Sequence, residues 1–303
     1  VFPGQGSQAV GMMSDLAEHH AEVKELFVEA SDVLGTDLWA MTQEGPIESL
    51  SQTENTQPAL LTAGVAAWRV WQKLGGGSPS MMAGHSLGEY TALVCAGALS
   101  FADGVALVRD RGRYMQEAVP VGEGGMAAIL GLEDQQVRDV CAAAAQGEVL
   151  QAVNFNAPGQ VVIAGSASAI ERGIEQMKEA GARRAMPLPV SIPAHSSLMS
   201  AASARLAERI ASVDISMPTV PVLHNCNVQT ADSTDAIAQN LVTQLDSPVR
   251  WVESIESMSA SGIDTFIESG PGRVLGGMIK RIAKGATTAC IEKADAYEAL
   301  INA

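Results

Sequence analysis

The sequence is poor in basic residues and has no long apolar run. Among its 303 residues, 19 Lys and Arg stand against 34 Asp and Glu, which gives a formal net charge of −15. Nucleic-acid-binding proteins normally show the opposite balance, so we expect no nucleic-acid partner, and an acidic protein partner would need a local basic patch. No apolar run approaches the roughly 20 residues of a membrane-spanning helix, and no segment typical of a secretory signal peptide is visible.

Cysteine is scarce and scattered. The four cysteines lie far apart, with no C-x-x-C pair: Cys95, Cys141, Cys226 and Cys290. Structural zinc sites and disulfide scaffolds need closer, paired spacings, so the sequence predicts neither a metal centre nor a disulfide framework. The spacing suits a reducing compartment, and we expect a cytoplasmic protein.

What the sequence does contain is enough apolar material for a large core. Hydrophobic residues make up 47% of the chain, and helical patterns alternate with short apolar runs separated by Gly and Pro. This alternation is typical of an α/β protein with a mostly parallel sheet. Residues 57–71 carry apolar positions at helical spacing, Met81–Ala83 fits a short buried strand, and a helix is expected over 195–213.

The middle of the chain has a different order of elements. We expect strands at 125–132, 149–155, 160–165 and 182–188, and helices at 133–145 and 167–180. The order β-α-β-β-α-β is that of the ferredoxin-like split fold. The sequence therefore predicts a small ferredoxin-like domain (123–191) inserted into a large, hydrolase-like α/β domain (1–122 and 192–303).

The segment Gly84-His85-Ser86-Leu87-Gly88-Glu89 lies between an expected strand and an expected helix. Gly-x-Ser-x-Gly in this context is the nucleophile-elbow pattern, in which the glycines allow the sharp turn that exposes the serine. The N–H groups at the helix start, that of Leu87 among them, could hold a developing oxyanion. The pattern predicts Ser86 as a nucleophile, and a turn with a helix-capping serine is the alternative.

A serine nucleophile needs a base, which is usually histidine. His195 follows the proline-stiffened loop Pro189–Ala194 and is favoured over His224, which ends an apolar strand. The side chain of His85 should point away from the serine. Between Ser86 and His195 each candidate acid fits a helix residue or cap (Asp103, Asp110, Asp134, Asp139), so the group that orients the base can be something other than a carboxylate.

Several motifs together resemble the bacterial malonyl-CoA:acyl-carrier-protein transacylases of the acyltransferase family, which serves fatty-acid and polyketide synthesis. In chain order they are Phe2–Gln8, Gln57–Leu60, Gly84–Glu89, Arg111–Met115, Asn154–Gln160, Pro189–His195, Gln244–Trp251 and Gly270–Gly272. Each motif is weak by itself, but together they cover nearly the whole chain in the right order. The roles of Asn154 and Asn156 stay open.

The resemblance implies a reaction and the residues that carry it. Malonyl would pass from malonyl-CoA to Ser86 and then to the phosphopantetheine thiol of acyl carrier protein, with no cofactor besides these substrates. His195 would be the base, oriented by the backbone carbonyl of Gln244. The N–H groups of Gln5 and Leu87 would form the oxyanion hole.

The resemblance also implies that Arg111 binds the free malonyl carboxylate through two parallel hydrogen bonds. Without the resemblance, we would expect Arg111 to pair with Glu117 or Asp110 on a helix surface. Leu87 is typical of malonyl-selective members, whereas Ala194 stands where such transacylases often have Ser.

Other functions remain open at this stage. A serine esterase or thioesterase would share the elbow and the base, but it would need an acid partner and no Arg111. A non-catalytic binding module would need none of the side chains of Ser86, His195 and Arg111. For carrier-protein docking, two basic clusters are candidates at the rim of the cleft, although each could be ordinary solvated charge: Lys280, Arg281 and Lys284, and Lys178, Arg183 and Arg184.

Overall fold

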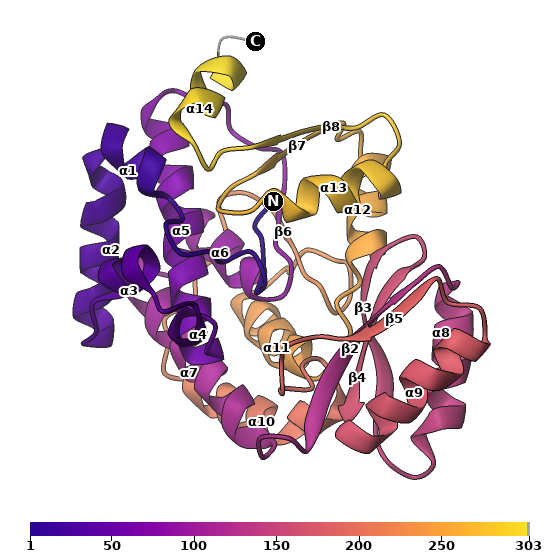
Figure 1. The fold of residues 1–303 in the computed structure, drawn as a ribbon. Helices are drawn as coiled ribbons and strands as arrows, with labels where there is room; N and C mark the ends of the chain where they lie inside the picture. The colour runs from indigo at the N-terminus through magenta and orange to yellow at the C-terminus, as the bar shows by residue number, and fades with distance from the viewer. Residues whose placement is uncertain (302–303) are drawn as a thin grey trace.

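In the computed structural model, which describes residues 1–301, the start of the chain lies between two pairs of parallel strands (Figure 1). The paired strands are β1 (Met82–Ala83) with β6 (Val222–Leu223), and β7 (Thr265–Glu268) with β8 (Thr287–Cys290). The N–H of Phe2 donates to Ala83 O, and the terminal amine of Val1 donates to Ile267 O, so the first residues connect the two pairs. The α/β class predicted from the sequence is confirmed.

Helices surround these strands. They are α1 (Ser14–His19), α2 (Ala21–Leu34), α3 (Leu38–Glu44), α4 (Ile47–Leu50), α5 (Thr53–Lys73), α6 (Leu87–Cys95), α7 (Phe101–Ala118), α10 (Ser200–Ile210), α11 (Thr234–Leu245), α12 (Trp251–Ala260), α13 (Val274–Ile282) and α14 (Ala294–Ile301). None of the helices that the structure describes combines the length and apolar character needed to span a bilayer.

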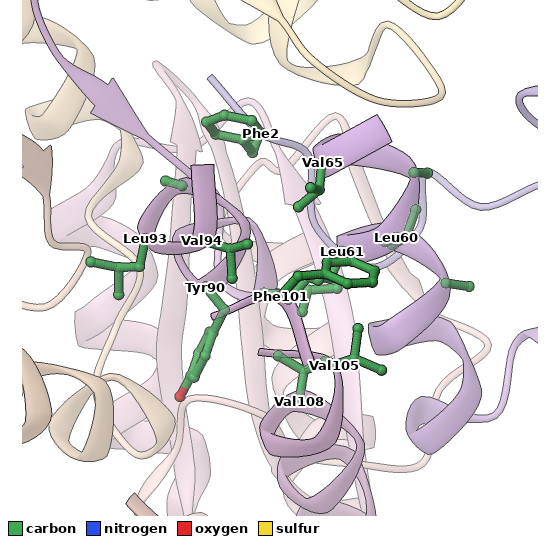
Figure 2. Packing of buried hydrophobic residues seen from close by; sticks show 14 of the residues in the cluster. Phe2, Leu60, Leu61, Val65, Tyr90, Leu93, Val94, Phe101, Val105 and Val108 are labelled. Carbon is green, nitrogen blue, oxygen red and sulfur yellow. The ribbon is translucent and has the colours of Figure 1, made fainter. Parts of the chain in front are cut away.

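The largest core lies where α5, α6 and α7 meet. Figure 2 shows Leu61 of α5, Val94 of α6 and Val105 of α7 converging on one apolar cluster. A Cβ on Gly64 would lie 2.7 Å from Thr91 Cγ2, so this glycine lets α5 approach α6 closely. Each fully buried Val or Leu contributes about 1.5–3 kcal/mol, and this core therefore holds the elbow helix α6 firmly in place.

The middle of the chain forms a separate four-stranded antiparallel sheet. Its elements are β2 (Gly124–Leu130), α8 (Asp134–Ala145), β3 (Leu150–Ala157), β4 (Gln160–Ser166), α9 (Ala167–Glu179) and β5 (Arg184–Pro187). The strands lie in the order β3-β4-β2-β5, and α8 and α9 cover one face (Figure 1). Every element lies within a few residues of its predicted range.

The two faces of this sheet differ because side chains alternate along a strand. Ala127 and Ile129 of β2 pack under the helices, whereas Met126 and Ala128 line a cleft on the opposite face. Val249 joins the sheet to the rest of the chain: its N–H donates to Val153 O, and its carbonyl accepts from Phe155 N. The β3 edge of the sheet is thereby joined to the segment that leads into α12.

The helix expected over 195–213 begins later than predicted. A 3₁₀ turn, Ser197–Met199, precedes α10, and His195 lies before both in the left-handed region, with φ of 64°. The N–H of His195 donates to Leu245 O, a bond to α11 that a helical start would not make. The prediction was wrong here because local apolar spacing carries no information about that distant acceptor.

Candidate active site

Ser86 lies at the tip of a strained turn between β1 and α6. Its φ is 52° and its ψ −107°, a backbone conformation that costs a non-glycine residue about 1–3 kcal/mol. A Cβ on Gly84 would lie 1.8 Å from Gly88 C, and one on Gly88 would lie 2.1 Å from Phe2 O, so both positions require glycine. The hydroxyl of Ser86 makes no capping bond to α6, so the helix-cap alternative is wrong.

The side chain of Asn225 holds the turn through two hydrogen bonds. Its Oδ1 accepts from the Ser86 N–H at 2.7 Å, and its Nδ2 donates to Gly84 O at 2.7 Å. These two bonds span the elbow and offset part of the strain. The loop after β6 therefore fixes the backbone of Ser86.

The structure brings Ser86, His195 and Gln244 together. Ser86 Oγ lies 2.7 Å from His195 Nε2, and His195 Nδ1 lies 2.8 Å from the backbone oxygen of Gln244. A carbonyl oxygen only accepts, so Nδ1 carries the proton and Nε2 is free to accept one from the serine. Burial, and then the nearby Arg111 charge, lower the pKa of His195 to about 3, so the imidazole is neutral at neutral pH.

The other histidine and acid candidates lie elsewhere. His224 Nδ1 is 2.7 Å from Glu89 Oε1 in a buried pair, and His85 Nε2 is 2.7 Å from Asn156 Oδ1. Asp103 is tied to Ser100 at the start of α7. Within residues 1–301, the ring of His195 is oriented by a backbone carbonyl in the place of a triad acid.

Arg111 of α7 is buried beside Ser86, with 1% of its surface exposed. Nη2 donates to Ser86 Oγ at 3.1 Å and to Gln244 Oε1 at 3.0 Å, and Nη1 donates to Gln57 Oε1 at 2.8 Å. The guanidinium carbon lies 5.2 Å from the centre of the Tyr90 ring. These partners carry no charge, and Nε has no partner among the described residues.

The alternative of a surface ion pair for Arg111 is wrong. Glu117 pairs with Arg205, and Asp110 pairs with Arg113 and Arg209. A buried cation without an acidic contact is costly unless something else compensates it. The arrangement is therefore suited to receive an anionic group next to Ser86.

A cleft of about 720 Å³ opens above these side chains, between the large core and the uncovered face of the antiparallel sheet. Ser86, His195 and Arg111 line it, together with Gln5 and Leu87. Leu87 is the first residue of α6, so its N–H is one of the free donors at a helix start. Asn154 and Asn156 of β3 line the cleft as well.

The acyl transferase domain family matches residues 1–293. The chain belongs to this acyltransferase family. The acyltransferase is 54% identical over 302 residues to the malonyl CoA-acyl carrier protein transacylase of Escherichia coli K12, covering 100% of this chain and 98% of the relative. The family resemblance predicted from the motifs is confirmed.

Solved structures agree with this assignment. The malonyl CoA-acyl carrier protein transacylase of Coxiella burnetii superposes on the acyltransferase with a TM-score of 0.98 at 48% identity, over 99% of this chain and 95% of that one. A malonyl-transacylase solved in complex with its type II polyketide acyl-carrier protein gives a TM-score of 0.98 at 49% identity, over 99% and 97% of the two chains.

Acylation of Ser86 in this acyltransferase is expected to stay independent of pH from about 8 down to about 5. A histidine accepts a proton only when it is neutral, so activity falls as the pH drops through its pKa. A pKa of about 3 for His195 places that fall far below the roughly 6.5 of an exposed imidazole. Rapid-quench measurement of acyl-Ser86 across this range checks the prediction, and half-loss near pH 6.5 would contradict it.

Proposed function

We propose that this acyltransferase moves a malonyl group from malonyl-CoA to the phosphopantetheine thiol of an acyl carrier protein, feeding fatty-acid synthesis in the cytoplasm. The observation that carries the proposal is the buried Arg111 guanidinium, 3.1 Å from Ser86 Oγ and without an acidic contact. Malonyl differs from acetyl by one carboxylate, and a planar guanidinium matches a carboxylate with parallel hydrogen bonds. The names of the similar proteins agree with this substrate and partner.

The first half-reaction acylates Ser86. Its hydroxyl oxygen attacks the thioester carbon while its proton passes to His195 Nε2, and the N–H groups of Gln5 and Leu87 receive the oxyanion. The carbon–sulfur bond then breaks, and the proton on His195 goes to the departing sulfur of coenzyme A. Removing one oxyanion donor typically costs roughly 2.7–4 kcal/mol in the transition state.

The second half-reaction runs the same steps in reverse with a different thiol. The phosphopantetheine sulfur attacks the carbonyl carbon of the malonyl-serine ester while its proton passes to His195. The ester carbon–oxygen bond then breaks, and His195 returns the proton to Ser86 Oγ. The side chains supply nucleophile, base and carboxylate binding, so the proposed reaction needs no cofactor or metal besides its two substrates. This is ping-pong chemistry, in which the acyl-enzyme persists after coenzyme A has left and until the carrier-protein thiol binds.

We further propose that the chain divides into a hydrolase-like large domain (1–122 and 192–303) and an inserted ferredoxin-like domain (123–191). The strand order β3-β4-β2-β5 and the element order β-α-β-β-α-β support the second part. The strand–elbow–helix path through Ser86 supports the first. The cleft between the two would then hold the acyl donor.

A serine esterase or thioesterase is the rival function. It would share Ser86 and His195, but it has no use for a buried cation beside the nucleophile. It would also release the acyl group to water quickly, whereas a transferase needs a lasting ester. A non-catalytic binding module has no use for either side chain.

Intact-mass spectrometry after incubation with malonyl-CoA tests the proposal. We expect the mass to rise by one malonyl group, located on the peptide that contains Ser86, and acetyl-CoA to leave the mass unchanged. Adding holo carrier protein should move the group to that protein. Free malonate without a lasting adduct on Ser86 would instead favour the hydrolase.

Carrier-protein docking is expected to depend on exposed basic residues of α13 and the turn after it. Arg281 and Lys284 are exposed, and Arg281 adjoins the cleft because it donates to Gln160 Oε1 at 2.5 Å and to Pro158 O at 2.6 Å. An acidic carrier protein would be attracted to this cluster. Reversing both charges should raise the KM for carrier protein about tenfold and leave acylation by malonyl-CoA intact.

The control separates docking from the bonds that Arg281 makes to the β3–β4 turn. Lys284→Glu alone leaves those bonds in place and should give part of the effect. Unchanged carrier-protein kinetics in the double reversal would remove this cluster from the docking surface. The cluster Lys178, Arg183 and Arg184 would then be tested in the same way.

A further inference from the structure

Glu89 is a buried carboxylate that the proposed reaction does not use. It lies on α6, close after the nucleophile in sequence, and is fully buried. Its Oε1 is 2.7 Å from His224 Nδ1. Its Oε2 accepts from the backbone N–H of Asn225 at 2.8 Å and from Gln244 Nε2 at 2.9 Å. Burying a carboxylate costs desolvation free energy, which packing alone does not offset.

The Gln244 side chain connects Glu89 to Arg111. Gln244 Nε2 donates to Glu89 Oε2 at 2.9 Å and to Ser86 O at 3.0 Å, which uses both hydrogens of the amide nitrogen. The amide oxygen must then face the other way, and it accepts from Arg111 Nη2 at 3.0 Å. The carboxylate thus sets the direction of the amide and, through it, the position of the guanidinium.

The charge of Arg111 suggests why Glu89 lies at the other end of these contacts. Arg111 is a buried cation whose hydrogen-bond partners are all neutral among the described residues. An anion in direct contact would compensate it, but would also occupy the donors that a substrate carboxylate needs. Burial lowers the pKa of Arg111, and the charge of Glu89 is among the effects that raise it.

We propose that Glu89 is the remote counter-charge of Arg111, held one amide away by Gln244. It compensates the guanidinium while the cleft is empty without placing a charged group on the donors beside Ser86, whose neutral partners an incoming carboxylate can replace. Glu89 is a positioning residue, since it touches no reacting atom. The proposal rests on the proposed function only in naming the malonyl carboxylate as the anion that Arg111 receives.

Glu89→Gln separates charge from geometry. The glutamine oxygen can still accept from Asn225 and Gln244, and its NH₂ can donate to His224 Nδ1 once the ring proton has moved to Nε2, so the contacts survive while the charge is lost. The thermal midpoints of wild type, Glu89→Gln, Arg111→Met and the double variant, all without ligand, then measure whether the two charges are coupled.

We expect each single variant to lower the midpoint, because each leaves one buried charge without its counterpart. The double variant should melt at least about 3 °C above Glu89→Gln, because it removes both charges together. If Glu89→Gln is insoluble, recovery of soluble protein in the double variant supports the coupling. If the two decreases in thermal midpoint simply add, or if the double variant melts no higher than Glu89→Gln, the coupling is overturned. Glu89 would then act only through His224 or through packing.

A binding experiment measures how the charge of Glu89 affects the affinity for malonyl-CoA. In a Ser86→Ala background, malonyl-CoA binds without acylating, and its affinity can be measured by calorimetry. Adding Glu89→Gln should tighten malonyl-CoA binding about tenfold, because the substrate carboxylate no longer meets a nearby negative charge, and should leave acetyl-CoA binding unchanged. Loss of affinity for both ligands alike would indicate a purely structural role and contradict the proposal.

Glu268→Gln is the matched control. Glu268 is also a buried carboxylate, 1% exposed, but its oxygens accept from the N–H groups of Leu275 and Gly276. Its loss should lower the midpoint without coupling to Arg111→Met and without changing malonyl-CoA affinity. If the Ser86→Ala protein binds malonyl-CoA no better than acetyl-CoA, the proposed function fails, while the ligand-free coupling between Glu89 and Arg111 still decides this inference.

Discussion

Replacing His195 by alanine is expected to slow acylation of Ser86 by malonyl-CoA by about 10³–10⁴-fold. General-base catalysis contributes about 10²–10⁴, and the upper part of that range applies because the imidazole lies 2.7 Å from Ser86 Oγ with its tautomer set by the Gln244 carbonyl. The strained elbow would remain, since Asn225 holds it independently of His195. Single-turnover measurement of the malonyl-serine adduct gives the rate.

His19→Ala is the control for this prediction. His19 is exposed on α1 and its Nδ1 lies 2.9 Å from the Asp15 carbonyl oxygen, so its loss should leave the acylation rate unchanged. Circular dichroism and the thermal midpoint would show that both variants are folded. A loss of less than about tenfold in His195→Ala would mean that another group takes the serine proton.

Replacing Arg111 by alanine is expected to lower kcat/KM for malonyl-CoA by about 10²–10³-fold. Hydrogen bonds between charged groups contribute about 1.5–3 kcal/mol each, and each 1.4 kcal/mol corresponds to about a tenfold change. Acetyl-CoA has no carboxylate to lose, so its rate should stay the same or rise. The preference between the two donors should therefore nearly disappear, which competition kinetics would show directly.

Two further variants test whether the guanidinium of Arg111 causes the preference for malonyl-CoA. Arg111→Lys keeps the charge without the planar fork and should recover only part of the loss. Arg113→Ala removes an arginine on the exposed side of the same helix, paired with Asp110, and should behave like wild type. If Arg111→Ala still preferred malonyl-CoA as strongly as wild type, the carboxylate would be bound elsewhere.

The features that the sequence predicts well are those fixed by local chemistry. The elbow follows from Gly84 and Gly88, because a Cβ at either position would overlap the backbone. The antiparallel sheet follows from short apolar runs and turn residues in the order β-α-β-β-α-β. The burial of Arg111 had a signal as well: it lies on the same stripe of α7 as the buried Val108 and Met115, at spacings of three and four residues.

Other features depend on contacts between distant parts of the chain. Glu89 meets His224 and Asn225 across more than a hundred residues, and no local pattern in the sequence encodes those bonds. The left-handed backbone of His195 depends on its bond to Leu245 for the same reason. The Gln244 carbonyl is a backbone group, so only the family resemblance pointed to it.

A crystal structure of the Ser86→Ala protein with bound malonyl-CoA tests the central claim most directly. The substrate carboxylate should lie within about 3 Å of the Arg111 guanidinium nitrogens, with the thioester carbon facing the position of the missing hydroxyl. A carboxylate directed into solvent, or held by other side chains while Arg111 keeps its present neutral partners, would contradict the account.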